Sequence, residues 1–117
     1  MFKLHELKCK ACRTGDPSLS DADIIRLHPL IPQWEVKRVD GCSCLERVFI
    51  CRNFYEALVF VGKVGKAAEE DHHHPLILIE YDKVKLNWWT HKVKGLHLND
   101  FIMAAKIDRL IRFHPLD

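Results

Sequence analysis

The sequence lacks long apolar runs and lacks an excess of charge of either sign. Its 117 residues are 48% apolar and 29% charged, and the formal net charge is only +2. No apolar run approaches the length of a transmembrane helix, and the start of the chain has no apolar stretch typical of a signal peptide. The basic residues are scattered, which argues against direct binding of nucleic acid. We therefore expect one globular domain in the cytoplasm, with no membrane partner.

The sequence also lacks an even number of cysteines. Five cysteines cannot all pair within one chain, so we interpret them as reduced thiols. Cys9 and Cys12 have the spacing of half a zinc site, and Cys42 and Cys44 could supply the other half across a long gap. The simpler interpretation is that Cys44 and Cys51 pack on strands and that the other thiols have no shared role.

Apolar periodicity predicts three helices and four strands. Helices are expected over residues 18–28, 53–71 and 99–113, with Ser20 and Asn53 as caps of the first two. Strands are expected over residues 34–39, 44–51, 76–81 and 84–91. The first two strands would be joined by a turn at 40–41 followed by a longer loop, and the last two by a turn at 82–83. The predicted core stripe of the middle helix is Phe54, Ala57, Leu58, Val61, Gly65 and Ala68, with Phe60 outside it.

This order of elements predicts an α+β fold. Two hairpins would form a four-stranded antiparallel sheet with about three helices packed on one face. Residues 1–17 would be an N-terminal extension that packs loosely or hangs free, and residues 18–117 would form the domain. The other face and the edges of the sheet would remain uncovered, which favours a homodimer or homotetramer.

Chemically active residues are densest at the end of the middle helix. Residues 69–75 read EEDHHHP, and His91 and Asp100 follow downstream. Histidine can give or take a proton near neutrality, and nearby carboxylates and a helix C-terminus both favour its charged form. By strand parity, Trp89 and His91 should leave the same face of the sheet. The simpler alternative is a solvated, charged helix end.

At these positions the sequence resembles the pterin-4a-carbinolamine dehydratase family. The resemblance covers roughly residues 19–113, and His72, Trp89 and His97 depart from the family pattern. The central residues that carry it are Glu69, His73, His74, Pro75, Tyr81, Thr90, His91, Gly95, Leu96 and Asp100. The upstream residues that fit it are Ser20, Asp21, Ala22, Asp23, Trp34, Phe54, Ala57, Leu58, Phe60 and Val61.

The resemblance implies a cytosolic dehydratase that removes water from 4a-hydroxytetrahydropterin to give quinonoid dihydropterin during pterin recycling. Family members need no metal or organic cofactor and are dimers or tetramers. The family pattern suggests His73 and His91 as an acid–base pair and His74 as a ligand of the polar edge of the pterin. Glu69 and Asp100 would orient histidines. The residues expected to contact the substrate are Pro75, Trp89 and Thr90.

Two alternatives follow from the same residues. Animal members of the family also bind a homeodomain transcription factor, and some relatives assist Rubisco assembly, so the chain could be a non-catalytic dimerisation or assembly factor. A metal protein built on His74, His91 and Glu69 is the other alternative. It is disfavoured because neighbouring helical residues point about 100° apart and cannot easily share one ion.

Overall fold

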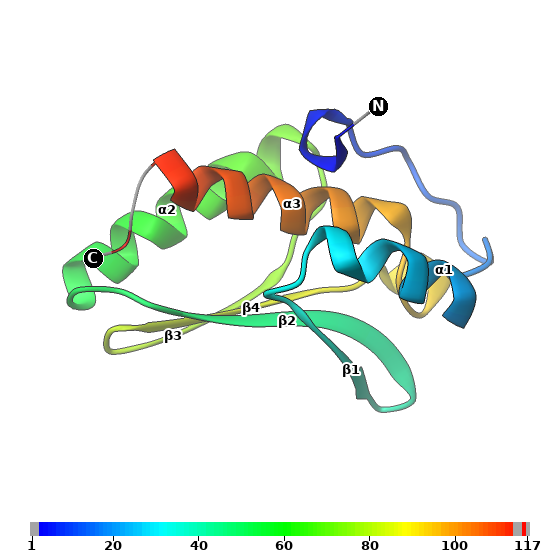
Figure 1. Cartoon of the computed structure of the whole chain (residues 1–117), viewed down its shortest axis with the longest axis horizontal. Helices are drawn as coiled ribbons and strands as arrows, with labels where there is room; N and C mark the ends of the chain where they lie inside the picture. Colours follow the sequence, from blue (N-terminus) through cyan, green and yellow to red (C-terminus); the bar gives the residue numbers. More distant parts are fainter. Residues whose placement is uncertain (1–2, 114–115, 117) are drawn as a thin grey trace.

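Two β-hairpins form one antiparallel sheet, and the helices cover one of its faces (Figure 1). The computed structural model describes residues 3–113 and 116. The strands pair in the order β1-β2-β4-β3. Their bounds are β1 Glu35–Val39, β2 Cys42–Ile50, β3 Leu76–Glu80 and β4 Lys83–Trp88. The α-helices are α1 Asp21–Leu27, α2 Phe54–Glu70 and α3 Leu98–Phe113, and the 3-10 turns are η1 Leu4–Glu6, η2 His28–Leu30 and η3 His91–Val93. The predicted α+β architecture is confirmed.

Local capping chemistry sets the start of α1 and α2. Ser20 Oγ accepts a hydrogen bond from the Asp23 amide at 3.1 Å, and Asn53 Oδ1 accepts one from the Glu56 amide at 2.8 Å. Each side chain thereby satisfies one of the amide groups that the first helical turn leaves without a partner. Both predicted caps are confirmed. Within residues 3–113 and 116, no helix is long and apolar enough to cross a membrane.

Both hairpin turns differ from the prediction. Val39 pairs directly with Cys42, so the first turn has only two residues, Asp40 and Gly41, and the expected longer loop is wrong. Both have positive φ, 53° and 79°, as a tight primed turn requires. In the second hairpin Glu80 pairs with Lys83, which moves the turn one residue back from its predicted position.

The core face of α2 also differs from the prediction. Ala57, Phe60, Val64 and Ala68 are buried, whereas Phe54 and Leu58 are 47% and 46% exposed. Two apolar stripes run along this helix, and sequence periodicity does not say which one meets the sheet. The stripe that contains Phe60 does so, because its ring packs against Phe49 of β2 with a centroid distance of 4.9 Å.

The N-terminal segment packs more closely than predicted. The η1 turn lies against α3, and Leu4 is buried in the core. Figure 1 shows this segment running along the helical layer on the side away from the sheet. Because α3 is covered on both sides, six consecutive residues of its first half are buried, Asn99 through Ala104.

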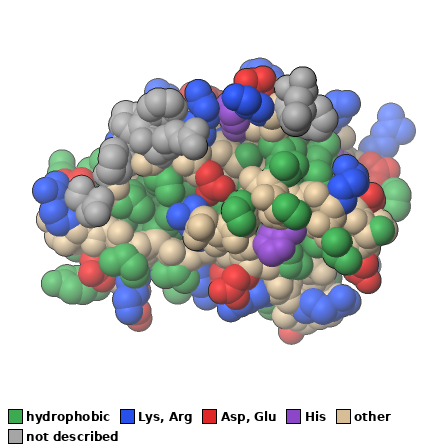
Figure 2. Space-filling model, viewed as in Figure 1, with side chains coloured by type: hydrophobic (Ala, Val, Ile, Leu, Met, Phe, Trp, Pro, Cys, Tyr) green, Lys and Arg blue, Asp and Glu red, His purple; other side chains and the backbone are tan. Residues whose placement is uncertain are grey.

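The sheet face opposite the helices remains open within the described chain. Five apolar side chains on it are exposed, Val39 of β1, Val48 and Ile50 of β2, and Leu76 and Leu78 of β3. On the face of the molecule drawn in Figure 2, Lys and Arg side chains lie among acidic and apolar ones and do not gather into one stripe.

Candidate active site

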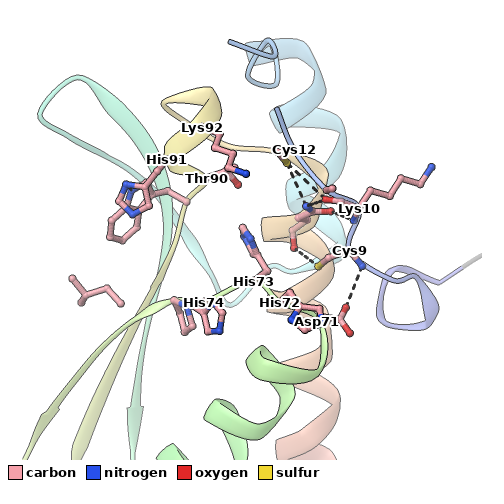
Figure 3. Close-up of a pocket in the computed structure, with 15 residues that line it drawn as sticks. Cys9, Lys10, Cys12, Asp71, His72, His73, His74, Thr90, His91 and Lys92 are labelled. Atoms are coloured by element: carbon pink, nitrogen blue, oxygen red, sulfur yellow. Dashed lines mark hydrogen bonds between the residues drawn. The ribbon is translucent and has the colours of Figure 1, made fainter. Parts of the chain in front are cut away.

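Three segments that are distant in sequence surround one cavity of about 700 Å³ (Figure 3). The first is the end of α2 and the residues that lead into β3. The second follows β4 and includes the η3 turn. The third is the N-terminal segment around Cys9 and Cys12. The cavity has the size of a typical small-molecule site. Its lining residues are Cys9, Lys10, Ala11, Cys12, Asp71, His72, His73, His74, Pro75, Leu76, Trp89, Thr90, His91, Lys92 and Asn99.

The end of α2 places the histidine triplet. The amide of His73 donates to the carbonyl of Ala68 at 3.1 Å, and the amide of His72 donates to Glu69 at 3.2 Å. This pair of hydrogen bonds is the Schellman arrangement, in which the first residue past the cap adopts a left-handed conformation. His72 does so, with φ 52°. The first histidine of the triplet therefore ends the helix and turns the chain so that His73 faces the cavity.

Asp100 holds His73 from the start of α3. It is fully buried, and its Oδ1 lies 2.6 Å from His73 Nε2. Its Oδ2 accepts hydrogen bonds from Thr90 Oγ1 at 2.8 Å and from the backbone amide of His97 at 3.0 Å. A carboxylate can only accept, so Nε2 of His73 carries the proton in this contact and Nδ1 has no hydrogen-bond partner among the described residues.

His97 caps the start of α3, where a Ser or Thr hydroxyl is the commoner cap, and it fixes the position of Asp100. His97 precedes α3, and its Nδ1 accepts a hydrogen bond from the Asn99 amide at 3.0 Å. Asp100, the third residue of the helix, reaches back to the His97 amide. Together these contacts form a capping box in which an imidazole replaces the hydroxyl. The positive end of the helix dipole also favours a carboxylate at this position.

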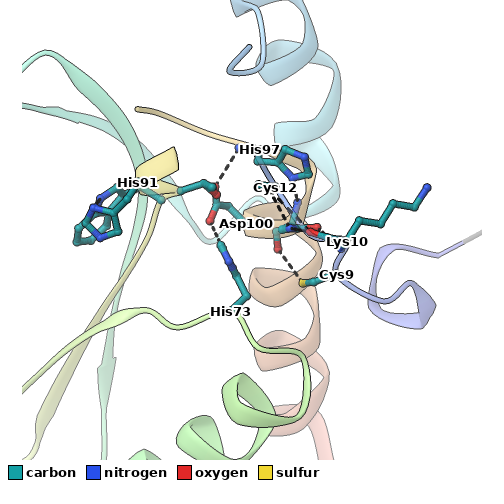
Figure 4. Close-up of polar contacts among 10 residues, drawn as sticks. Cys9, Lys10, Cys12, His73, His91, His97 and Asp100 are labelled. Carbon is teal, nitrogen blue, oxygen red and sulfur yellow. Dashed lines mark hydrogen bonds and ion pairs between the residues drawn. The ribbon is translucent and has the colours of Figure 1, made fainter. Parts of the chain in front are cut away.

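The ring of His73 is held on its face as well as its edge. It stacks on Trp88 with a centroid distance of 5.7 Å and an angle of 13° between the planes. Trp88 is buried at the end of β4, and its Nε1 has no hydrogen-bond partner among the described residues. His73 therefore occupies one fixed position between an aromatic wall and a buried carboxylate. Figure 4 shows its ring pointing toward Asp100.

His91 lies on the opposite side of the cavity, in a turn rather than on the strand that parity assumed. β4 ends at Trp88, Thr90 forms an isolated bridge with Gly95, and His91 begins η3. Trp89 and His91 nevertheless lie together, with ring centroids 4.9 Å apart and Trp89 Nε1 donating to His91 Nδ1 at 3.3 Å. His91 is exposed to solvent.

His74 pairs with Glu69 on the surface. Its Nε2 lies 2.7 Å from Glu69 Oε1, and the two side chains are 61% and 76% exposed. The hydrogen bond from His74 keeps the pKa of Glu69 below its usual value. Glu69 does not line the cavity, so it supports His74 from the solvent side.

The structure shows contacts beside the cavity that the sequence did not indicate. Asn99 is buried, and its side chain bonds to both backbone polar groups of Lys10, at 2.9 Å and 2.6 Å. Asp71 accepts from the amide of Cys9 at 3.1 Å and from Lys106 Nζ at 2.7 Å. Cys9 and Cys12 were noticed in the sequence for their spacing, but nothing local predicts that they border this cavity.

The cysteine pairs do not converge. Cys9 and Cys12 border the site, while Cys42 and Cys44 lie on β2 beside a separate cavity on the open sheet face. Among residues 3–113 and 116, no group of three or more His, Cys, Asp or Glu side chains could hold a metal ion. This geometry gives no support to the zinc alternative or to the alternative site at Glu69, His74 and His91.

Of the predicted site residues, six line the cavity and two stand behind it. His73, His74, His91, Pro75, Trp89 and Thr90 line it. Asp100 and Glu69 each contact one of these histidines from outside the lining. Thr90 was expected to contact the substrate, but its hydroxyl donates to Asp100. The arrangement can hold a flat ligand between two imidazoles that have different hydrogen-bond partners.

Comparisons with known proteins identify one family. Residues 17–110 match the family described as Pterin 4 alpha carbinolamine dehydratase. A relative from Nitrosococcus oceani, named "Putative pterin-4-alpha-carbinolamine dehydratase", is 51% identical over 112 residues, which are 96% of this chain and 99% of the relative. A relative from Gloeobacter violaceus, named "Putative pterin-4-alpha-carbinolamine dehydratase 1", is 48% identical over 109 residues, 93% of this chain and 94% of the relative.

Two solved structures share the fold. A transcriptional coactivator/pterin dehydratase from Brucella melitensis superposes with a TM-score of 0.71 at 26% identity, covering 80% of this chain and 97% of that one. A pterin dehydratase-like protein described as a RuBisCO assembly factor of the alpha-carboxysome superposes with a TM-score of 0.57 at 18% identity, covering 67% and 88%. The second likeness concerns the fold alone.

Proposed function

Because this chain belongs to the pterin-4a-carbinolamine dehydratase family, we propose that it removes water from 4a-hydroxytetrahydropterin to give quinonoid dihydropterin. The observation that carries the proposal is the pair of differently partnered imidazoles, His73 and His91, on opposite sides of one cavity. The reaction breaks the carbon–oxygen bond at carbon 4a. It requires a proton for the departing hydroxyl and a base for a proton on the pterin ring.

His73 is suited to act as the base. Its Nε2 proton is committed to Asp100, which leaves the lone pair of Nδ1 available. When Nδ1 takes the ring proton, the imidazolium that forms lies 2.6 Å from a buried carboxylate. Such a carboxylate fixes the tautomer of the neutral ring and stabilises the charged one, as in the histidine–aspartate pair of serine proteases.

His91 is suited to act as the acid. It is exposed, so it can take a proton from solvent before each turnover. The contact with Trp89 requires a neutral ring whose Nδ1 accepts, so His91 would take up its second proton at Nδ1 and release Trp89. The charged ring would then pass its Nε2 proton to the departing hydroxyl. The electron pair of the broken bond leaves with the oxygen, and water is released. His73 then releases its proton to solvent and His91 takes one up from solvent, which restores both rings.

The remaining cavity residues would bind and orient the pterin. His74, hydrogen-bonded to Glu69, would contact the polar edge of the ring. Pro75 and Trp89 would form apolar walls, since an indole can stack on a flat aromatic ligand. Thr90 would act mainly through its hydrogen bond to Asp100. No step in this scheme uses a metal or an organic cofactor.

Exposed apolar surface supports self-association, as a homodimer or homotetramer. Phe54, Tyr55 and Leu58 lie exposed on α2, and the open face of the sheet adds Val48 and Leu78. Surfaces of this kind commonly mark protein contacts. They also favour a second candidate function, a dimerisation or assembly factor without catalysis. One protein with this fold is named a transcriptional coactivator/pterin dehydratase, and another is described as a RuBisCO assembly factor.

One assay separates the two candidates. The purified chain is given synthetic 4a-hydroxytetrahydropterin, and dehydration is compared for wild type, His73→Ala and His91→Ala. Each substitution should lower kcat by roughly 10²- to 10⁴-fold, the usual effect of losing a positioned acid or base. Circular dichroism should be unchanged. Dehydration at the uncatalysed rate by the wild type would reject the enzyme and leave the assembly factor, and unchanged rates in both variants would reject the assignment of the pair.

A further inference from the structure

We propose that residues 9–15, here called the strap, are a positioning element that holds the two histidine-bearing segments of the site in register. The inference rests on the proposed function and extends it to a part of the chain that the family resemblance does not cover. In Figure 3 the strap runs along one side of the cavity, opposite His74 and His91.

The strap is attached to both segments that carry the histidines. At its start, the amide of Cys9 donates to Asp71 Oδ2 at 3.1 Å. Asp71 caps the end of α2 and directly precedes the histidine triplet. At its other end, the amide of Gly15 donates to the carbonyl of Lys92 at 3.1 Å. Lys92 directly follows His91, so one short stretch of chain connects the two sides of the cavity.

Asn99 fixes the strap at its second residue, Lys10. Its Oδ1 accepts from the Lys10 amide at 2.9 Å, and its Nδ2 donates to the Lys10 carbonyl at 2.6 Å. The carboxamide thus satisfies both backbone groups of Lys10, as a neighbouring strand would. Asn99 is 3% exposed and immediately precedes Asp100, the partner of His73. Any shift of the strap would therefore move Asn99, and with it the neighbouring Asp100.

The attachment of the strap to Asp71 is strengthened by a salt bridge. Lys106 of α3 lies with its Nζ 2.7 Å from the same Oδ2 that accepts from Cys9. Burial acts to raise the pKa of Asp71, but the hydrogen bonds from Lys106 and Cys9 outweigh it and leave the pKa below its usual value. The strap, the end of α2 and α3 therefore meet at one ionised carboxylate.

The two cysteines of the strap contact Asn99 as neutral thiols. Cys9 Sγ lies 3.7 Å from the Asn99 carbonyl, and Cys12 Sγ lies 3.5 Å from Asn99 Nδ2. Burial and the nearby Asp71 raise the pKa of Cys9 to about 12, and burial also raises that of Cys12. A thiol that does not ionise near neutrality is a poor nucleophile and a poor metal ligand. Their role in this arrangement is packing.

The side chain of Lys10 does not serve as a ligand group. In Figure 3 it points away from the cavity and from the histidines. The strap therefore contributes backbone, Ala11 and thiol surface to the cavity wall, and its effect on catalysis is geometric. Displacing reacting groups by about 1 Å can cost about 100-fold in rate, so even a small loss of register should be measurable.

The first experiment measures hydrogen exchange in the full chain without ligand. Asn99→Ala removes both bonds to Lys10, and Lys8→Ala is the matched control because Lys8 is exposed next to the strap. We expect exchange to rise at least 10-fold in the strap and also in residues 72–74 and 90–93, with the control unchanged. Faster exchange confined to the strap would overturn the proposal. This experiment uses no pterin, so it decides the matter even if the proposed reaction fails.

The second experiment measures kinetics. If the strap sets the register of the histidines, Asn99→Ala should lower kcat by roughly 10- to 100-fold per folded molecule. A purely structural role would lower the unfolding midpoint and leave kcat per folded molecule unchanged, and that result would overturn the proposal. Lys10→Pro removes the strap's own amide donor and also restricts the backbone at residues 9 and 10, and it should reproduce the loss with Asn99 intact. It also replaces Asn99→Ala in both experiments if that variant does not fold.

Discussion

Two histidine–carboxylate pairs lie within one site. They consist of the same chemical groups at nearly the same distance, but they differ in solvent exposure and in the number of other donors to the carboxylate. His73 and Asp100 are 2.6 Å apart with side chains 13% and 0% exposed, whereas His74 and Glu69 are 2.7 Å apart and 61% and 76% exposed. Asp100 has two further donors, Thr90 and the His97 amide, while the side-chain carboxylate of Glu69 has only His74 among the hydrogen bonds of the described chain. Distance alone does not distinguish the two pairs.

The surroundings decide what each pair can do. Water screens an exposed ion pair and competes for its hydrogen bonds, so such a pair constrains its members weakly. A buried carboxylate has no water to stabilise its charge, so its protein donors must do so. The carboxylate and its donors therefore hold one another in fixed positions. The buried pair is therefore suited to fix a tautomer and to receive charge, and the exposed pair is suited to adapt to a ligand.

The sharpest way to break the buried pair is Asp100→Asn. An amide offers one acceptor and one donor group where three donors now converge, so His73 must accept at Nε2 or another donor must lose its partner. If the amide donates to Nε2, the proton of neutral His73 moves to Nδ1 and the base is lost. We expect kcat to fall by about 10²- to 10⁴-fold.

The measurement is steady-state kinetics beside thermal unfolding. The variant should also be less stable, because hydrogen bonds to a neutral amide are weaker than those to the carboxylate that it replaces. Glu69→Gln is the matched control, since it makes the same carboxylate-to-amide change in the exposed pair. Equal effects of the two substitutions on kcat would show that burial does not distinguish the pairs.

The third imidazole extends the comparison, because His91 has an indole partner in place of a carboxylate. Trp89→Ser removes a cavity wall and the donor to His91 Nδ1. We expect KM to rise about 10-fold and kcat to change by less than about threefold, the pattern of a contact made equally in the ground and transition states. Trp89→Phe keeps an aromatic wall but has no N–H group, so it should restore most of the lost affinity.

The outcome separates three roles for Trp89. A fall in kcat that is equal in both variants would mean that the N–H contact to His91 matters more than the wall. Unchanged kinetics with an altered oligomer distribution in sedimentation would place Trp89 in a subunit contact. Trp89 also borders the second cavity, of about 380 Å³, on the open sheet face, so sedimentation should be measured on both variants.

Local sequence signals predicted the parts of this molecule that local chemistry controls. Ser20 and Asn53 mark the starts of their helices because their side chains bond to amides three residues away. The order of strands and helices followed from periodicity in the same way. The contact of Cys9 with Asp71 spans 62 residues, and that of Lys10 with Asn99 spans 89, so no local pattern could indicate either.

The errors have the same cause. The core stripe of α2 was misplaced because two apolar stripes satisfy helical spacing and only the packing partner, Phe49, selects between them. The position of the second turn depends on the register between β3 and β4, which pairs Glu80 with Lys83. For the site, family resemblance selected the cavity-lining histidines, but the burial that separates His73 from His74 required the fold.

The smallest effect should come from breaking the exposed pair. Glu69→Gln keeps an oxygen that can accept from His74 but removes the charge. The hydrogen bond from His74 now holds the pKa of Glu69 below its usual value, so the carboxylate stays ionised at neutral pH and the substitution does remove a charge. Both side chains are largely exposed, and water can replace the lost attraction. We expect kcat to change by less than about threefold.

The remaining effect of Glu69→Gln should depend on salt. Screening by about 0.15 M salt acts over about 8 Å and already weakens an exposed pair, so any rise in KM should shrink as salt is added. Steady-state kinetics of wild type and Glu69→Gln at low and high salt test this. If Glu69 only tunes the binding of the ligand by His74, wild type and Glu69→Gln should have the same KM at high salt. A loss in kcat of about 100-fold that persists at high salt would instead mean that Glu69 is as important for catalysis as Asp100.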